Sequence, residues 1–261
     1  MCSSADPVDA GTGRLDGLTA HELARHLALP RVELFASVGS TLDVAHRIAP
    51  DAPSGTLIVA DGQTAGRGRH GRRWSSAPGA GLWLTFIERP TDARALDVLA
   101  LRCGLYAAES LDALAGATVC VKWPNDLYVG GRKLGGILIE TRWRGTAPEW
   151  VAIGVGLNVQ RPDLDTAAGL GPSATRLAAL ECVAPALRRA ASASRHLSDD
   201  ELARWRKRDV AANRMVVEPA PGRAAGIDSD GQLVVTAPDG SASRHRTGSL
   251  TFGDSLPLTC S

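Results

Sequence analysis

One glycine- and arginine-rich segment carries the chain's densest set of groups that could bind an anion. Residues 62–74 read GQTAGRGRHGRRW. The glycines let the backbone approach a ligand closely, and the guanidinium forks of Arg67 and Arg69 match the oxygens of a carboxylate or a phosphate. Arginines this close together repel one another unless an anion lies between them. The segment therefore predicts a site for a carboxylate or phosphate group.

Three other interpretations fit parts of this arginine segment. Gly66, Gly68 and Gly71 match the G-x-G-x-x-G pattern of dinucleotide-binding loops, but that pattern should open a helix and here a strand follows. A loop that grips nucleic acid would need more stacking groups than Trp74, the only aromatic residue nearby. A solvated basic loop without a ligand stays open.

Two further segments place polar groups beside glycines. Residues 122–129 read KWPNDLYV, and residues 132–140 continue after a tight turn as RKLGGILIE. A lysine at the head of a strand and next to two glycines suits an anion that must approach the sheet closely. Lys133 is equally explained as an ordinary surface lysine of the hairpin. Residues 153–159 form an apolar strand with two glycines, and its Asn158 either caps the turn or hydrogen-bonds a ligand.

The elements around these segments alternate between short apolar strands and helices. Strands are predicted at 32–36, 56–60, 81–87, 119–122, 127–129, 133–140 and 150–155, and helices within 18–29, from 40, over 92–114 and within 173–209. Pro185 should break or begin a helix. Gly130-Gly131 supplies the positive φ angles of a tight hairpin turn. Consecutive hairpins predict an α+β fold with much antiparallel pairing.

The C-terminal part changes to short strands with a period of two. They are predicted at 215–218, 223–227, 232–236 and 243–246, separated by Pro-Gly and Asp-Gly turns. We therefore expect three parts: a flexible segment with one short helix at 1–30, a central domain at 31–210 and a small β-barrel at 211–261.

Composition limits the classes of protein that the chain can belong to. The 261 residues include 29 Lys plus Arg against 28 Asp plus Glu, for a net charge of +1, and 44% are hydrophobic. This argues for a globular protein with a substantial core and against binding nucleic acid by bulk electrostatics. No stretch reaches the roughly 20 apolar residues of a membrane span, and no signal peptide begins the chain. We expect a cytoplasmic protein.

The five cysteines show no metal-binding or disulfide pattern. They are scattered without CxxC spacing or a matching set of histidines. A reduced protein is the default expectation. Cys103 and Cys120 lie in apolar runs and are predicted to be core residues.

Five blocks of the chain, in this order and spacing, resemble the biotin protein ligase family. The family pattern runs Ser-Thr-Asn, GRGRxGR-x-W, KWPND, KLxGIL-E and G-x-G-x-N. The chain matches it at Ser40-Thr41, 66–72 with Trp74, 122–126, 133–140 and 154–158. The resemblance implies a mixed, largely antiparallel sheet flanked by helices, as in class II aminoacyl-tRNA synthetases, with a C-terminal barrel of the Src-homology-3 type.

The resemblance also implies a two-step ligase reaction. Biotin and Mg-ATP would form biotinyl-5′-adenylate, and the biotinyl group would pass to a lysine of a biotin carboxyl carrier domain. Arg67, Arg69 and Lys133 would be catalytic, because a carboxylate and an α-phosphate repel unless cations neutralise them. No covalent enzyme intermediate is required, and the loop over residues 66–71 would close over the adenylate.

The resemblance carries two sets of binding residues. Biotin-binding residues would be Ser40, Thr41, Gln63, Gly66, Arg67, Gly68, Arg69, Lys133 and Gly136. Nucleotide-binding residues would be Arg67, Arg69, Trp74, Asn125, Asp126, Lys133 and Asn158, with Asn125 and Asp126 also open to a role toward Mg²⁺ or the acceptor lysine.

Two departures from the family pattern matter. Leu42 replaces the usual Asn after Ser-Thr, so affinity for biotin should differ from the family norm. About thirty residues precede the core, too few for the winged-helix DNA-binding domain of some members, so we expect a stand-alone ligase without DNA binding, as a monomer or homodimer. The alternatives are a lipoate or octanoate ligase or transferase of the same fold, and a nucleic-acid-binding regulator.

Overall fold

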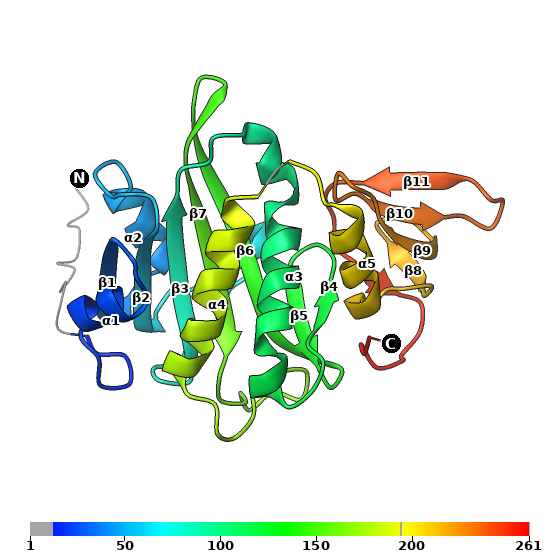
Figure 1. Cartoon of the computed structure of the whole chain (residues 1–261). Helices are drawn as coiled ribbons and strands as arrows, with labels where there is room; N and C mark the ends of the chain where they lie inside the picture. Colours follow the sequence, from blue (N-terminus) through cyan, green and yellow to red (C-terminus); the bar gives the residue numbers. More distant parts are fainter. Residues whose placement is uncertain (1–12, 194, 261) are drawn as a thin grey trace, which may run out of the picture.

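The fold is built on a seven-stranded sheet, shown in Figure 1. The computed structural model describes residues 13–193 and 195–260. The strand order is β1-β2-β3-β7-β6-β5-β4; only β1 and β2 pair in parallel, and every other neighbouring pair is antiparallel. The strands are β1 Arg31–Val38, β2 Thr56–Gln63, β3 Gly81–Glu88, β4 Cys120–Lys122, β5 Asp126–Val129, β6 Arg132–Arg144 and β7 Ala147–Asn158. The predicted α+β fold with a largely antiparallel sheet is confirmed.

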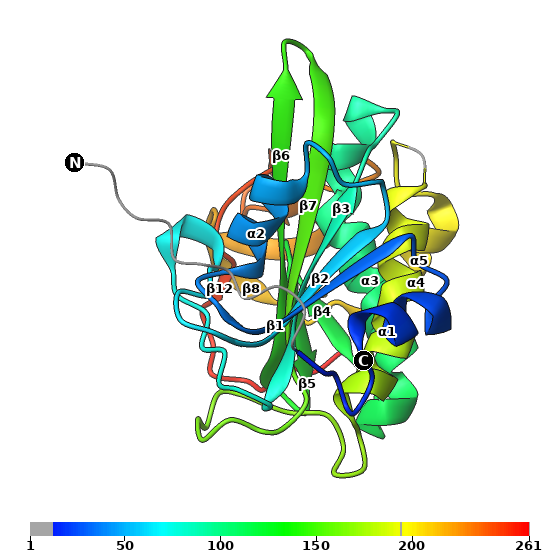
Figure 2. The ribbon, with the colours of Figure 1, turned by 90° about the vertical axis from the view of Figure 1, so that its left-hand side faces the viewer.

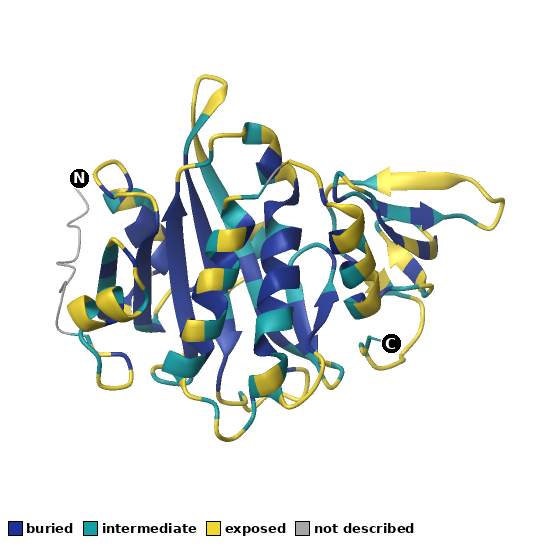
Figure 3. Cartoon of the chain, viewed as in Figure 1, coloured by how far each residue is buried: buried dark blue, intermediate teal, exposed yellow. Residues whose placement is uncertain are grey.

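Helices cover both faces of this sheet. They are α1 Ala20–His26, α2 Thr41–Ile48, α3 Leu96–Ala115, α4 Arg176–Ala191 and α5 Asp199–Arg208, with 3₁₀ turns at η1 Arg69–Gly71 and η2 Ala93–Ala95. Figure 2 shows α2 on one side of the sheet and α3 and α4 on the other. Successive residues of β3 point to opposite faces of the sheet. Because helices cover both faces, every residue of β3 is buried, as its dark colour in Figure 3 shows.

Side chains at alternating positions of the large sheet's strands point to opposite faces and form two separate hydrophobic cores. Leu84 and Phe86 join the core under α3 and α4, whereas Ile87 joins the smaller core under α2. The α2 helix begins as predicted, because the Ser40 hydroxyl accepts a hydrogen bond from the Leu42 amide and Asp43 occupies the first turn.

The prediction that Pro185 breaks or begins a helix is wrong. Helix α4 runs through it without interruption. An internal proline removes a helix hydrogen bond and costs about 3 kcal/mol. Leu180, Val183 and Leu187 on the same helix are fully buried against α3, and each contributes about 1.5–3 kcal/mol. Tertiary packing therefore outweighs the local penalty.

The chain before α1 is only partly covered by the described residues. Residues 1–12 of the segment that we expected to be flexible lie outside them. Leu15, by contrast, is buried and forms an isolated bridge with Leu18. The first helix begins at a capping box formed by Thr19 and Glu22.

A second, five-stranded sheet follows α5. Its strands are β8 Met215–Glu218, β9 Gly222–Ile227, β10 Leu233–Thr236, β11 Ala242–His245 and β12 Thr251–Phe252, in the order β11-β10-β9-β8-β12. Strand β12 had no signal in the sequence, because two residues are too few to show a period of two. The segment between β11 and β12 returns to the large sheet and reaches the cavity described below.

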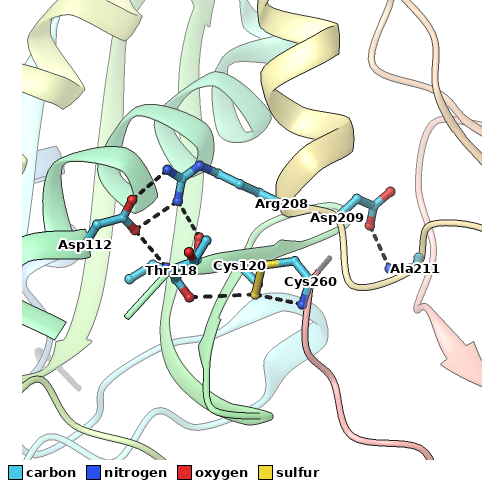
Figure 4. Close-up of a disulfide and its surroundings, with 8 residues drawn as sticks. Asp112, Thr118, Cys120, Arg208, Asp209, Ala211 and Cys260 are labelled. Atoms are coloured by element: carbon cyan, nitrogen blue, oxygen red, sulfur yellow. Dashed lines mark hydrogen bonds and ion pairs between the residues drawn. A yellow bond between two sulfur atoms is a disulfide. The ribbon is translucent and has the colours of Figure 1, made fainter. Parts of the chain in front are cut away.

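The prediction of a fully reduced chain is wrong, although Cys120 is a buried core residue as predicted. Cys120 at the start of β4 forms a disulfide with Cys260 (Figure 4). The two residues are 140 positions apart in sequence and meet because the C-terminal segment returns along the edge of the large sheet, where Leu258 bridges to Gly131. Cys103 is buried and free, as predicted. Among the described residues, no helix has the length and apolarity to cross a membrane.

Candidate active site

A cavity of about 410 Å³ opens on the α2 face of the large sheet, between the arginine segment and the C-terminal sheet. Its lining collects residues from all five sequence blocks. They are Ser40, Thr41, Leu42, Gln63, Arg67, Gly68, Arg69, His70, Arg72, Arg73, Trp74, Lys122, Trp123, Pro124, Asn125, Asp126, Lys133, Gly136, Ile137, Leu138, Gly154, Val155, Gly156, Glu218, Ser249, Leu250 and Thr251.

One end of the cavity is a connected set of neutral polar groups. The Gln63 side-chain oxygen accepts hydrogen bonds from the Thr41 amide at 2.9 Å and the Thr41 hydroxyl at 3.2 Å. The Thr41 hydroxyl in turn accepts from Thr85 at 2.9 Å, and the Gln63 amide donates to Ser76 at 2.8 Å. These bonds fix Gln63 and Thr41 in place before a ligand binds, so this end is preorganised to recognise a neutral polar group.

Leu42 makes the adjoining wall apolar. Its side chain is buried and packs on Gly154 of β7, where a Cβ atom would lie 3.1 Å from three carbons of Leu42. A side chain with no hydrogen-bonding atom thus occupies the position where the family pattern has an amide. This wall can contact hydrocarbon but cannot hydrogen-bond a ligand.

Trp74 lies on a floor made by two glycines that face each other across β6 and β7. Gly136 and Gly156 are paired in the register. A Cβ atom on Gly156 would meet the indole nitrogen at 2.5 Å, and one on Gly136 would lie 3.6 Å from the ring. The indole N–H is buried and has no partner among the described residues. The indole nitrogen therefore lies against the sheet backbone at Gly156.

The arginine segment folds as a narrow hairpin over the cavity. Arg67 and Arg73 form a bridge, the Gly68 amide donates to the Arg72 carbonyl at 2.8 Å, and the Trp74 amide donates to the Gly66 carbonyl at 2.9 Å. Gly66 does not line the cavity. A side chain there would come within 2.5 Å of the Trp74 carbonyl, so this glycine serves the closure of the hairpin.

Arg69 reaches from the tip of this hairpin toward the C-terminal sheet. Its Nη1 contacts Asn125 Oδ1 at 3.4 Å and donates to the Gly248 carbonyl at 3.3 Å. Burial lowers the pKa of Arg69, Asp126 opposes the shift and Arg72 adds to it. Guanidinium remains charged in proteins, so a half-buried cation faces the cavity here.

Lys133 and Lys122 form the cationic end of the cavity. Lys133 Nζ lies 2.8 Å from Asp126 Oδ1 and 5.3 Å above the Trp74 ring. Lys122 Nζ lies 5.3 Å from the Phe252 ring centroid. Burial lowers the pKa of Lys122, Asp126 opposes the shift and neighbouring cations add to it. These ammonium groups can neutralise a phosphate that enters between them.

Sequence reasoning named most of this lining but missed several residues. Lys122 heads the KWPND block and could have been selected on the same grounds as Lys133. Glu218 and Thr251 come from the C-terminal sheet, and Ser249 comes from the segment between β11 and β12. None of them carries a motif, so only the fold brings them here. Asn158 does not line the cavity; it is buried, and its amide donates to the Ala168 carbonyl at 3.0 Å.

This geometry can hold one elongated ligand. Neutral hydrogen-bonding groups lie at one end, an apolar wall follows, and an indole with two lysines and an arginine lies at the other. Such an arrangement suits an organic acid whose carboxylate points toward a phosphate. The described residues hold no group of three His, Cys, Asp or Glu that could form a resident metal centre.

Comparisons with known proteins agree with the fold and the blocks. The model of the biotin/lipoate A/B protein ligase family matches residues 34–158. A curated relative, the biotin–acetyl-CoA-carboxylase ligase of Mycobacterium tuberculosis, is 37% identical over 184 residues, which cover 67% of this chain and 65% of that protein. Over these residues the chain is similar to this family, in agreement with the five sequence blocks.

Other curated relatives match over a smaller share of their own length. The bifunctional ligase/repressor BirA of Bacillus spizizenii is 37% identical to this chain over 163 residues, which cover 62% of the chain and 49% of the relative. The chain thus spans about half the length of this relative.

Solved structures of the ligase family share the fold. The biotin protein ligase of Aquifex aeolicus in complex with biotin and ATP superimposes with a TM-score of 0.69 at 24% identity, covering 85% of this chain and 98% of that one. The Leishmania major biotin protein ligase in complex with biotinyl-5-AMP superimposes with a TM-score of 0.60 at 25% identity, covering 82% and 98%. The fold class expected from the sequence blocks is therefore confirmed.

Proposed function

We propose that this chain is an ATP-dependent biotin protein ligase. It activates biotin as biotinyl-5′-adenylate and then transfers biotin to a lysine of a biotin carboxyl carrier domain. The observation that carries the proposal is the convergence of Arg69, Lys122 and Lys133 on one end of a cavity whose other end holds the neutral network of Thr41 and Gln63. The Mycobacterium relative is named as a ligase of biotin, and the Aquifex ligase was solved with biotin and ATP; both support these substrates.

In the first step, a biotin carboxylate oxygen bonds to the α-phosphorus of ATP and the bond to pyrophosphate breaks. Both reactants are anions, and negative charge gathers on the phosphate oxygens as the bonds exchange. Arg69 and Lys133 stabilise that charge with groups fixed in place beforehand. The Trp74 ring lies 5.3 Å from Lys133 Nζ, within the same end of the cavity. Gly68 and Gly136, which also line the cavity, would lie beside the biotin carboxylate.

In the second step, the carrier lysine amine bonds to the acyl carbon and AMP leaves with the electron pair. This step needs an amine without its extra proton and a cation near the departing phosphate. Asp126 lies beside Lys133 at the open cationic end and is placed to accept that proton. Asn125 holds this loop in place, because its amide donates to the Ile137 carbonyl at 2.7 Å.

Magnesium would enter with ATP rather than as a resident ion. Mg²⁺ prefers one or two carboxylates together with substrate phosphates. Asp126 and Glu218 are carboxylates in the lining, so the donor set fits a magnesium nucleotide. Bound there, the ion would neutralise phosphate charge and help pyrophosphate to leave.

The test is to incubate the purified chain with Mg-ATP and biotin and to follow pyrophosphate release and biotinyl-adenylate by mass spectrometry. A biotin carboxyl carrier domain is then added, with a carrier whose target lysine is replaced by arginine as control. We expect adenylate in the first stage and biotin on the lysine-bearing carrier alone. Activation of lipoate or octanoate but not biotin would overturn the proposal, as would nanomolar duplex DNA binding without ligase activity.

One observation favours the second candidate, a lipoate or octanoate ligase. Leu42 offers hydrocarbon where the family pattern has an amide. Biotin carries a ureido group that needs hydrogen-bonding partners, whereas octanoate does not. Leu42→Asn should therefore shift the ratio of biotin to octanoate activation toward biotin by about tenfold. An unchanged ratio would show that Leu42 does not face the acyl group.

A further inference from the structure

A set of side chains beside the cavity holds the first arginine of the arginine segment. Arg67 donates to both oxygens of Glu140, with Nη1–Oε1 and Nη2–Oε2 distances of 2.9 Å. Its Nη2 also lies 3.0 Å from Asp43 Oδ1. Bidentate pairs between arginine and carboxylate fix both position and orientation. The Arg67 guanidinium is thus engaged by two carboxylates of the chain itself.

Glu140 is in turn oriented by His46. The His46 Nε2 lies 2.8 Å from Glu140 Oε2, and the Trp150 indole nitrogen lies 3.2 Å from His46 Nδ1. Because an indole N–H can only donate, Nδ1 must accept and Nε2 carries the proton that is donated to Glu140. The hydrogen bonds therefore run in one direction, from Trp150 through His46 to Glu140.

The partners of Arg67 all lie on regular elements, whereas Arg67 lies in a loop. Glu140 belongs to β6 and Trp150 to β7, which pair along this stretch. Asp43 and His46 are three residues apart on α2 and so share one face of the helix. Helix α2 packs against β2, β3 and β7. A rigid platform thus determines where the loop is held.

We propose that Asp43, His46 and Glu140 are positioning residues that anchor Arg67 and keep the arginine segment closed over the cavity. Because Arg67 bridges to Arg73 across the hairpin, fixing Arg67 fixes the base of the segment. The carboxylates of Asp43 and Glu140 outweigh the single positive charge of Arg67, so the net charge around Arg67 is negative. The anionic part of a ligand is therefore directed to Arg69 and Lys133. Arg67 is then the anchor of the segment, and Arg69 faces the ligand.

Limited trypsin digestion of the full chain without substrates tests the anchor directly, since Arg67, Arg69, Arg72 and Arg73 are all trypsin sites. Glu140→Gln should raise the rate of cleavage within residues 67–73 by about tenfold, because cleavage follows the population of the open loop. The matched control is Glu109→Gln, which breaks a pair with Arg204 on the far side of the sheet and whose carboxylate is about as exposed as that of Glu140. Equal cleavage rates in both variants and the wild type would overturn the proposal.

Two further comparisons separate anchoring from a general loss of structure. Arg67→Ala and Glu140→Ala should each raise cleavage, and the double variant should be no worse than the more severe single variant, because both remove one contact. His46→Phe should raise cleavage, whereas His46→Gln, which can still donate to Glu140, should restore protection. Additive effects of Arg67→Ala and Glu140→Ala, or equal behaviour of the two His46 variants, would contradict the proposal.

The kinetic consequence of the anchor rests on the proposed function. Glu140→Gln should speed escape of the adenylate into solution and raise the KM for biotin by about tenfold, while pyrophosphate release at saturating biotin stays within about twofold of wild type. A fall in that maximal rate with unchanged KM would instead assign Glu140 to the chemical step and overturn the anchor. Proteolysis needs no substrate, so if the chain failed to activate biotin, the proposed function would be lost while the anchor was still measured.

Discussion

The indole nitrogen of Trp74 lies so close to the backbone of Gly156 that a Cβ atom on this glycine would come within 2.5 Å of it. Gly156 sits in the middle of the large sheet, paired with Trp83 of β3 and Gly136 of β6. The sheet backbone cannot move, whereas Trp74 belongs to a surface hairpin. The absence of a side chain at Gly156 therefore determines how closely the arginine segment packs against the sheet.

Replacing Gly156 by alanine should displace Trp74 and the hairpin with it. A shift of about 1 Å in a group that positions substrate can cost about 100-fold in rate, so we expect that loss in pyrophosphate release with an intact fold by circular dichroism. Gly104→Ala in α3 is the control, because its new methyl group would meet only Ile137, at 3.9 Å. Near-normal activity of Gly156→Ala would show that Trp74 does not position the ligand.

Arg69 and Lys133 should each be needed for adenylate formation. Removing one preorganised charge-stabilising group typically costs about 10²–10³ in kcat, so Arg69→Ala and Lys133→Ala should lose activity on this scale while their thermal unfolding stays close to wild type. Arg206→Ala and Lys207→Ala, both exposed on α5, serve as controls of equal charge change. Turnover at the wild-type rate in either site variant would remove that residue from the catalytic set.

Local patterns predicted the elements that hold the site. The Ser40 cap, the Gly130-Gly131 turn and the short apolar strands depend on neighbouring residues alone, so their sequence signals survive folding. Helix α4 shows the limit of local reasoning, since only its burial against α3 explains why it tolerates Pro185.

Contacts between distant segments could not be predicted from the sequence. Glu218 and Thr251 reach the cavity from the C-terminal sheet, and Glu140 reaches Arg67 across 73 positions. Glu140 belongs to the block at residues 133–140, but no neighbouring residue in the sequence indicates that Arg67 is its partner. Such contacts depend on strand order and loop paths, which periodicity does not encode.

The disulfide between Cys120 and Cys260 should stabilise the folded chain. Closing so long a loop typically contributes about 2–4 kcal/mol, so Cys260→Ser should lower the free energy of unfolding in urea by that amount under oxidising conditions. Cys182→Ser, at a free and half-buried cysteine, is the control. Thiol titration of the oxidised, denatured chain should find two fewer thiols than after reduction. A full set of reactive thiols without reductant would contradict the bond.

Asp209 should make the protein less stable as the pH rises through the mildly acidic range. The carboxyl group is buried, and Oδ1 accepts from the Ala211 amide at 2.8 Å. Burial raises the pKa of Asp209 to about 6, although the Ala211 amide and the Trp205 side chain oppose the shift. The folded state therefore binds a proton that the unfolded state releases near pH 4, and stability falls between about pH 4 and pH 6.

Asp209→Asn keeps the acceptor for Ala211 and removes the titration. At pH 7.5 this variant should be more stable than the wild type by roughly 1–3 kcal/mol, and the difference should vanish below pH 4. Asp112→Asn is the opposite control. Partial burial raises the pKa of Asp112, but hydrogen bonds from Arg208 and the Val119 amide lower it further, so the net shift is downward. The charged Asp112 therefore stabilises the fold above pH 4, and this variant should lose stability at pH 7.5. Urea unfolding across this pH range measures both, and parallel curves for Asp209→Asn and the wild type would show that Asp209 does not titrate in the folded protein with a raised pKa.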